Sequence, residues 1–234
     1  MKKQKLAILL IITTVLSMFT FPAHAISYEY FPDVPDDAPY AYAVNVLAGS
    51  GIFAGDDRGN FNPDKTITRA EFATIVCRLL GVEDEAKAIK TSSFNDVSSS
   101  HWACGYITKA AELGLVNGYG NGRFGPADTL TYEQTVTILL RAWGYENAAV
   151  IAGGYPKGYL AIADEIGIIS NTPSTNTKEN INRSVVAVLT YNTLLVQPSV
   201  SNSSSESSQN DTNGDYFVEP DSDMTERDFE NNDE

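Results

Sequence analysis

Three equivalent positions in the chain carry side chains that suit ligand binding: Arg69, Tyr132 and Arg183. Each follows a Thr or Asn, residue types that favour a helix N-cap, so each should lie in the first turn of a helix. The helix dipole disfavours a cation there by about 0.3 kcal/mol or more. A first-turn arginine beside unpaired backbone N–H groups can instead hold an anion, because a guanidinium grips a carboxylate with two hydrogen bonds. The alternative is a solvated arginine, or one paired with a carboxylate such as that of Asp64.

The segments that follow these positions are predicted to be capped amphipathic helices. Thr68 and Glu71 match a capping box, in which each side chain accepts a hydrogen bond from the backbone N–H of the other residue. Apolar residues then recur at helical spacing until Gly81 ends the helix. Thr131 begins a second such box, and Asn182 repeats the cap without the reciprocal acid.

The chain repeats itself. Moving the sequence by 63 residues places Phe31-x-Asp33-Val34 on Phe94-x-Asp96-Val97, and Thr68 on Thr131. A third, weaker copy places Asn182 51 residues after Thr131. Self-similarity at this density indicates stacked copies of one supersecondary unit. Each copy is expected to form a helix–loop–helix unit, so residues 29–196 should be mainly α-helical, with short strands at most.

The two ends of the chain differ in composition from this repeated part. Three lysines, an apolar run and the sequence Ala23-His24-Ala25 predict a secretory signal peptide that is cleaved before Ile26. The apolar run is shorter than the ~20 residues that span a bilayer, so no membrane span is expected after cleavage. Residues 201–234 hold 11 acidic residues and one basic residue, which predicts a disordered acidic tail. The predicted domains are therefore a signal peptide (1–25), three modules (29–90, 91–150 and 151–197) and the tail (198–234).

The charge and the scarcity of reactive side chains exclude several classes of function. A net charge of −14 argues against nucleic acid as a partner, because phosphate binding needs a basic surface. His24 leaves with the signal peptide, so His101 stands alone and is expected to cap a helix or lie at the surface. No catalytic triad, metal site or cofactor site is predicted. Acidic residues from Asp56 onward lack the spacing of an EF-hand and are better explained by a Gly-rich turn.

The two cysteines leave one alternative open. Cys77 and Cys104 lie in successive copies, and an exported chain permits a disulfide between them. However, Cys77 aligns with Leu140, an ordinary apolar position, which favours two unpaired thiols.

The quoted motifs together resemble the S-layer homology domain family. The resemblance rests on "FPDV", "FNPDKTITRAEFATIVCRLLG", "FNDVSSSHWACGYITKAAELGLVNGYGNGRFGP" and "LTYEQTVTILLRAWG", and it covers about residues 29–196. It implies a helical fold in which three modules form a pseudo-trimer. It also implies a secreted protein that is held non-covalently on a Gram-positive cell wall. The implied partners are the secondary cell wall polysaccharide, often through a pyruvate ketal, or peptidoglycan, which the grooves between modules bind.

The resemblance also supplies candidate binding residues, because residues 68–71 reproduce the family's T-R-A-E signature. The second copy has Tyr132 in place of the arginine, which can stack on a sugar but cannot hold a carboxylate. We expect one complete groove, in which Arg69 meets an aromatic residue from a neighbouring module such as Trp102, and we expect Arg183 to matter less. The candidate ligand-binding residues are Arg69, Asp33, Thr68, Glu71, Trp102, Asp96, Tyr132 and Arg183.

Two other classes of function remain open at this stage. Degenerate modules can pack against other surface-layer proteins instead of a glycan, which would make the chain a structural or interaction protein. A carbohydrate-active enzyme would need two carboxylates as acid and base. Since the modules fill the folded part, we expect that the protein is not an enzyme.

Overall fold

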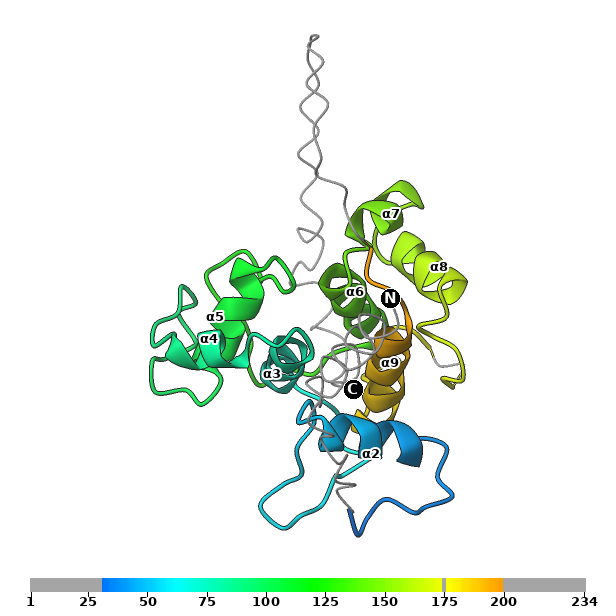
Figure 1. Ribbon diagram of the computed structural model, residues 1–234. Helices are drawn as coiled ribbons and strands as arrows, with labels where there is room; N and C mark the ends of the chain where they lie inside the picture. Colours follow the sequence, from blue (N-terminus) through cyan, green and yellow to red (C-terminus); the bar gives the residue numbers. More distant parts are fainter. Residues whose placement is uncertain (1–30, 174–175, 200–234) are drawn as a thin grey trace, which may run out of the picture.

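The computed structural model describes residues 31–173 and 176–199, and this part of the chain is helical (Figure 1). It contains eight α-helices and no strands, as the sequence predicted. The predicted signal peptide and nearly all of the acidic tail lie outside the described residues. The helices are α2 (Ala41–Gly49), α3 (Arg69–Leu79), α4 (Glu83–Ala88), α5 (Cys104–Glu112), α6 (Tyr132–Ala142), α7 (Glu146–Ile151), α8 (Lys157–Glu165) and α9 (Arg183–Leu195).

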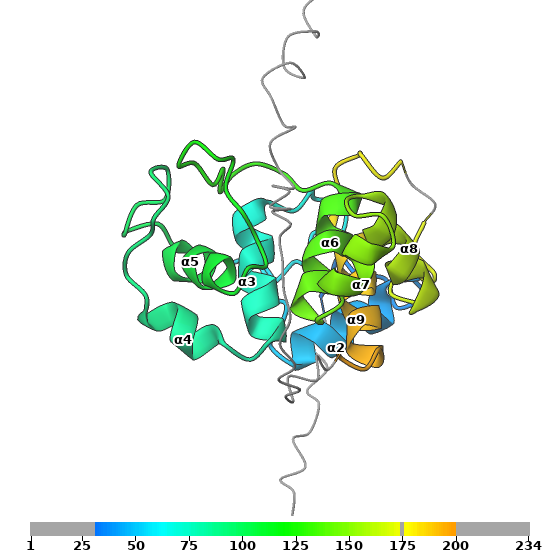
Figure 2. The ribbon, with the colours of Figure 1, turned by 90° about the horizontal axis from the view of Figure 1, so that it is seen from above.

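The helices pair between copies of the repeat. Helix α3 of the first copy packs on α5 of the second, and α6 packs on α8 in the same way. Helix α9 of the third copy packs on α2 of the first, which closes the arrangement. Figure 1 accordingly shows α3, α6 and α9 around the centre and the remaining helices in three outer lobes, and Figure 2 shows α4 and α5 on the opposite side of the molecule from α8. The pseudo-trimer is confirmed, but each helix finds its main partner in another copy and not in its own.

A ring of three backbone hydrogen bonds lies at the centre of the pseudo-trimer. The N–H of Ile67 donates to the carbonyl of Ile181 at 3.1 Å, and the N–H of Leu130 donates to Ile67 at 3.1 Å. The N–H of Ile181 completes the ring by donating to Leu130 at 2.9 Å. All three side chains are buried. One residue from each copy therefore contacts the other two copies directly.

Backbone carbonyls close to these central residues accept hydrogen bonds from the N–H groups at the helix N-termini. The first N–H groups of α3, α6 and α9 donate to carbonyls of another copy, in the pairs Arg69 to Asp128, Tyr132 to Glu179 and Arg183 to Lys65, at 2.8, 3.1 and 2.9 Å. The second N–H groups do the same. The expectation of unpaired N–H groups beside Arg69 is therefore wrong, because those donors hold the copies together.

Side-chain capping follows the sequence in two of the three helices. Both capping boxes, at Thr68 with Glu71 and at Thr131 with Gln134, are present. Asn182 makes no side-chain cap bond, because its side-chain oxygen accepts from the hydroxyl of Ser184. The third predicted cap is therefore wrong, and α9 depends on the carbonyls of the first copy.

The aspartates of the F-x-D-V motifs hold the loops that follow the first helices. Asp33 accepts from the backbone N–H groups of Phe61 and Asn62 at 2.8 and 2.6 Å. Asp96 accepts from Phe124 and Gly125, both at 2.8 Å. Each carboxylate thus ties the start of a copy to its own F-x-P segment. In these contacts Asp33 and Asp96 support the loops and do not face a ligand.

Other residues singled out by the sequence also have local structural roles. Cys77 and Cys104 are buried and unpaired, which confirms the free thiols. His101 accepts from the N–H of Ala103 at 3.1 Å in the turn before α5, and α5 has no side-chain cap bond, so the capping alternative for His101 is wrong. Asp56 accepts from the N–H groups of Arg58 and Asn60, both at 2.9 Å, as expected for a turn. Within residues 31–173 and 176–199, no helix is both long and apolar enough to cross a bilayer.

Candidate functional site

Two grooves open between the copies, and we name each after its exposed aromatic residue. The Trp102 groove is the larger, with a volume of about 280 Å³ against about 70 Å³ for the Tyr155 groove. Polar and aromatic residues of the Trp102 groove are Phe53, Asp56, Asn62, Lys65, Glu71, Thr74, Arg78, Trp102 and Arg183. Those of the Tyr155 groove are Arg69, Asn117, Tyr119, Gln134, Thr137, Arg141 and Tyr155.

The two grooves are equivalent under the repeat. Glu71, Thr74 and Arg78 correspond to Gln134, Thr137 and Arg141, each 63 residues further on. Each groove takes a loop and a helix from one copy, a first-turn arginine from the preceding copy and an aromatic ring from the following copy. The ring fold makes the third copy precede the first, so Arg183 belongs to the groove of the first copy.

Arg183 is fixed against the loop of the first copy in the Trp102 groove. Its Nε donates to the carbonyl of Phe61 at 2.8 Å, and a terminal nitrogen donates to Ala54 at 3.1 Å. The guanidinium also lies over the Phe61 ring, 4.8 Å from its centre. Burial lowers the pKa of Arg183, while the nearby carboxylate of Glu71 opposes that effect. The guanidinium of Arg183 is thus a cation that is held in a fixed position among the residues that line the groove.

The rest of the Trp102 groove combines an exposed ring with charged groups. Trp102 is 61% exposed and stacks beside His101, with 5.8 Å between the ring centres. Glu71 pairs with Lys65 at 2.8 Å. Burial raises the pKa of Glu71, but hydrogen bonds from Lys65 and Thr68 outweigh burial and keep it below its usual value. Arg78 pairs with Glu83 at 3.0 Å. The residues that line the groove therefore carry both signs of charge, positive on Lys65, Arg78 and Arg183 and negative on Asp56 and Glu71.

In the Tyr155 groove, Arg69 makes the contacts that Arg183 makes in the other groove. Its Nε donates to the carbonyl of Phe124 at 2.8 Å, and a terminal nitrogen donates to Asn117 at 2.5 Å. The guanidinium lies 4.4 Å from the centre of the Phe124 ring and 5.0 Å from that of Tyr119. Arg69 is half-buried, so the alternative of a merely solvated arginine is also wrong.

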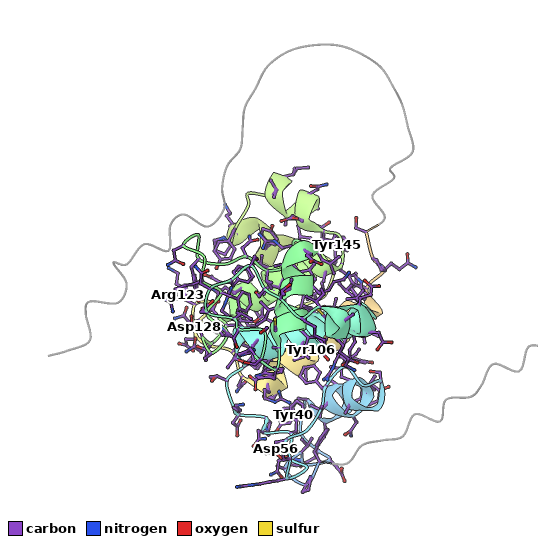
Figure 3. The ribbon with its side chains drawn as sticks, turned by 90° about the vertical axis from the view of Figure 1, so that its left-hand side faces the viewer. Tyr40, Asp56, Tyr106, Arg123, Asp128 and Tyr145 are labelled. Carbon is purple, nitrogen blue, oxygen red and sulfur yellow. The ribbon has the colours of Figure 1, made fainter. Side chains whose placement is uncertain are left out.

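Carboxylates border the Tyr155 groove but are not among the residues that line it. Tyr155 donates its hydroxyl to Glu133 at 3.1 Å, and Tyr119 donates to Asp128 at 2.9 Å. Arg123 and Asp128 belong to the loop between α5 and α6, at a distance from Asp56 in the lobe of the first copy (Figure 3). Because Gln134 stands at the position of Glu71, the lining residues that the structure describes include Arg69 and Arg141 and no acid; Arg141 pairs with Glu146 at 3.0 Å.

The third equivalent position is closed by its own side chains. Tyr132 is buried, and its hydroxyl lies 2.8 Å from that of Thr172 in the third copy. Its ring is therefore not presented to solvent, and the expected stacking on a sugar does not fit this geometry. Asn192 stands where the other copies have Arg78 and Arg141, and its amide donates to the carbonyls of Ile168 and Ser170.

The structure corrects the expected partnership between Arg69 and Trp102, because the two residues line different grooves. No single copy holds the arginine, the glutamate and the tryptophan in its own sequence. The Trp102 groove nevertheless collects an arginine, a T-R-A-E glutamate and a tryptophan from three different copies. Sequence reasoning missed Arg78, Arg141 and Tyr155 as lining residues, although the repeat aligns both arginines and places Tyr155 53 residues after Trp102.

Comparison with known proteins agrees with the repeats. The S-layer homology domain family matches residues 30–73 and 93–136. The chain is 41% identical over 162 residues to a "Cell surface protein" of Thermoanaerobacter kivui, covering 66% of this chain and 21% of that protein. It is 36% identical over 141 residues to a "Middle cell wall protein" of Brevibacillus brevis (60% and 13%). It is 34% identical over 144 residues to a "Surface layer protein" of Brevibacillus choshinensis (61% and 13%).

The chain thus spans about a fifth or less of the length of these curated relatives. The family match and the surface-layer relatives together indicate a secreted protein of the cell surface. The chain therefore carries two regions that match the S-layer homology domain.

Proposed function

We propose that the chain attaches non-covalently to a Gram-positive-type cell wall by binding an anionic wall polysaccharide in the Trp102 groove. The observation that carries this proposal is the exposed Trp102 ring in one groove with the fixed guanidinium of Arg183. An exposed indole offers a flat apolar surface to a sugar ring, and a pre-positioned guanidinium offers two parallel donors to a carboxylate. A sugar that bears an acidic substituent matches both features.

The charges of the Trp102 groove favour a polymer with defined acidic substituents over a uniformly anionic one. Arg183, Lys65 and Arg78 attract an anion, whereas Glu71 and Asp56 repel one that is placed wrongly. Opposed charges of this kind select the orientation in which a ligand binds more than they strengthen its binding. This argument supports secondary cell wall polysaccharide as the first candidate, with peptidoglycan as the second.

The Tyr155 groove is a second, smaller candidate site for the same polymer. Its exposed Tyr155 corresponds to Trp102, and Arg69 corresponds to Arg183. Thr68 and Glu71 cap α3, and through this helix they position Arg69 for its contacts with the second copy.

The grooves support binding and not catalysis. Of the two acids that line the Trp102 groove, Glu71 bonds Thr68 and Lys65, and Asp56 bonds its own turn. A glycosidase needs one carboxylate free to protonate the leaving group and another to act as base or nucleophile. We therefore propose an anchoring role without enzymatic activity.

The test is a binding assay of the mature protein on purified walls, before and after removal of the secondary polymer. We expect binding to depend on the polymer and to fall at least tenfold in Trp102→Ala, since truncating a central aromatic residue of a binding site typically costs about 1.4 kcal/mol or more. Tyr42→Ala is the matched control, because Tyr42 is 60% exposed but lies on α2 and lines neither groove. Equal binding to stripped and intact walls, or equal losses in the two variants, would overturn the proposal.

A further inference from the structure

The described chain ends beside the helix that carries Arg141. The N–H of Ser199 donates to the carbonyl of Trp143 at 2.9 Å, and the indole of Trp143 donates back to Val196 at 2.7 Å. Tyr145, labelled in Figure 3, donates its hydroxyl to Gln197 at 3.0 Å. Residues 196–199 are therefore fastened along the end of α6. The same helix supplies Gln134, Thr137 and Arg141 to the Tyr155 groove.

The segment that follows Ser199 has the charge and the side chains that this groove suits. Its 11 acidic residues and single arginine lie between 201 and 234. Near its middle stands Asp215-Tyr216-Phe217-Val218-Glu219, two carboxylates around two aromatic rings. The described lining offers the guanidinium of Arg69 and two exposed tyrosines, Tyr119 and Tyr155, while the guanidinium of Arg141 pairs with Glu146 at 3.0 Å. The lining of the Trp102 groove, by contrast, sets Glu71 and Asp56 against Arg183, Lys65 and Arg78, which leaves it a smaller excess of positive charge.

We propose that the acidic tail of the same chain occupies the Tyr155 groove, with the segment around residues 215–223 as the occupant. A carboxylate of the tail meets the guanidinium of Arg69, and its aromatic rings lie against Tyr119 and Tyr155. The tail thereby competes with an anionic external ligand for this groove and leaves the Trp102 groove open.

The connection is long enough for this contact. Fifteen residues lie between Ser199 and Asp215, and a Gly/Ser-type linker of about that length has a root-mean-square span of about 20–25 Å. Attachment through such a linker gives an effective concentration on the order of 1 mM, so a weakly binding segment is sufficient. Removing the tail should then raise the affinity of the Tyr155 groove for an anionic ligand by about two- to tenfold.

The experiment places a nitroxide spin label on the tail of the mature protein and records amide signals of the folded part. Ser222→Cys supplies the label site, because the native thiols of Cys77 and Cys104 are buried and resist labelling. We expect signal broadening to concentrate at residues 117–120 and 155 and to spare residues 53–56. Exchange of Asp215, Glu219, Asp221 and Asp223 for their amides should remove the broadening without affecting the fold of the groove.

The spin-label experiment uses no wall material, so it tests the contact of the tail independently of the proposed wall binding. Broadening that is uniform, that centres on the Trp102 groove or that persists in the neutralised tail would overturn the proposal. So would broadening seen only between labelled and isotope-enriched molecules in a mixture, because the tail would then act on another copy. A localised effect that is lost on neutralisation supports the contact within one chain.

Discussion

The guanidinium of Arg183 lies 4.8 Å from the centre of the Phe61 ring, although 122 residues separate the two in sequence. This contact joins the last helix to the loop of the first copy. Arg183, which comes from the third and most degenerate copy, thus helps to hold the loop of the first copy, whose T-R-A-E signature is intact. The same relationship joins Arg69 to Phe124, so both arginines serve stability as well as the grooves.

The stability of the fold should depend on both arginines. We expect Arg183→Ala and Arg69→Ala each to lower the free energy of unfolding by about 2–3 kcal/mol, because each removes charge-assisted hydrogen bonds to two carbonyls. Urea denaturation measures the effect. Arg58→Ala, at an exposed turn, serves as control and should change little. Equal denaturation curves for Arg69→Ala and Arg58→Ala would contradict this expectation.

Wall binding should depend more on Arg183 than on Arg69. Loss of a charge-assisted contact of about 1.5–3 kcal/mol in Arg183→Ala corresponds to about 10- to 150-fold weaker binding. Arg183→Lys should recover only part of the affinity, because an ammonium lacks the planar fork. The measurement is a binding isotherm on purified walls at moderate salt and at a temperature where all variants are folded. A larger loss in Arg69→Ala would instead assign the main site to the Tyr155 groove.

Exchange of Gln134 for Glu should separate the roles of the helix cap and the groove charge. Gln134→Glu recreates the capping box of α3, and an acid in the first turn stabilises a helix by about 0.3–1 kcal/mol. The same change places a carboxylate among the residues that line the Tyr155 groove. We expect a slightly higher unfolding midpoint together with weaker spin-label contact from the tail. The reciprocal Glu71→Gln should leave the tail contact unchanged.

Acid stability should depend on Glu83. A hydrogen bond from Tyr106 and the contacts with Arg78 and Lys87, against the opposing effect of burial, lower the pKa of Glu83 to about 2. Since the pKa of Glu83 in the folded protein lies below the ordinary glutamate value of 4.5, this stabilisation is present above about pH 4.5 and is lost as the pH falls toward 2. Glu83→Gln should therefore flatten the dependence of unfolding free energy on pH in that window. Glu165→Gln, at an exposed position, should leave the wild-type slope, and an unchanged slope in Glu83→Gln would contradict the assignment.

The thiols should react only when the protein opens. Burial raises the pKa of Cys77 to about 12, so little thiolate forms at neutral pH. We expect Cys77 and Cys104 to resist a thiol reagent in the native protein and both to react in denaturant. Rapid native labelling of Cys77 would show that the interface between α3 and α5 opens locally.

The sequence predicted where the helices lie along the chain better than it predicted which helices contact one another. Capping residues and apolar spacing located α3 and α6 because these signals are local, and the repeat then located the weaker α9. Periodicity identifies a repeated unit, but it does not say which unit each helix face contacts. For that reason Trp102 was assigned to the groove of Arg69, whereas closure of the ring places it with Arg183. Similarly, the N–H groups of α3 seemed unpaired only because their acceptors lie in the second copy, at Pro126 and Asp128.

The closed ring also determines what can fold as one cooperative unit. A fragment that ended at residue 136, where the second family match ends, would remove α9 together with Arg183 and Ile181. The first copy would then lose the helix that covers α2, and the central hydrogen-bond cycle would open. The third copy therefore completes the fold through α9, Arg183 and Ile181, although the equivalent groove position in that copy is closed by Tyr132 and Thr172.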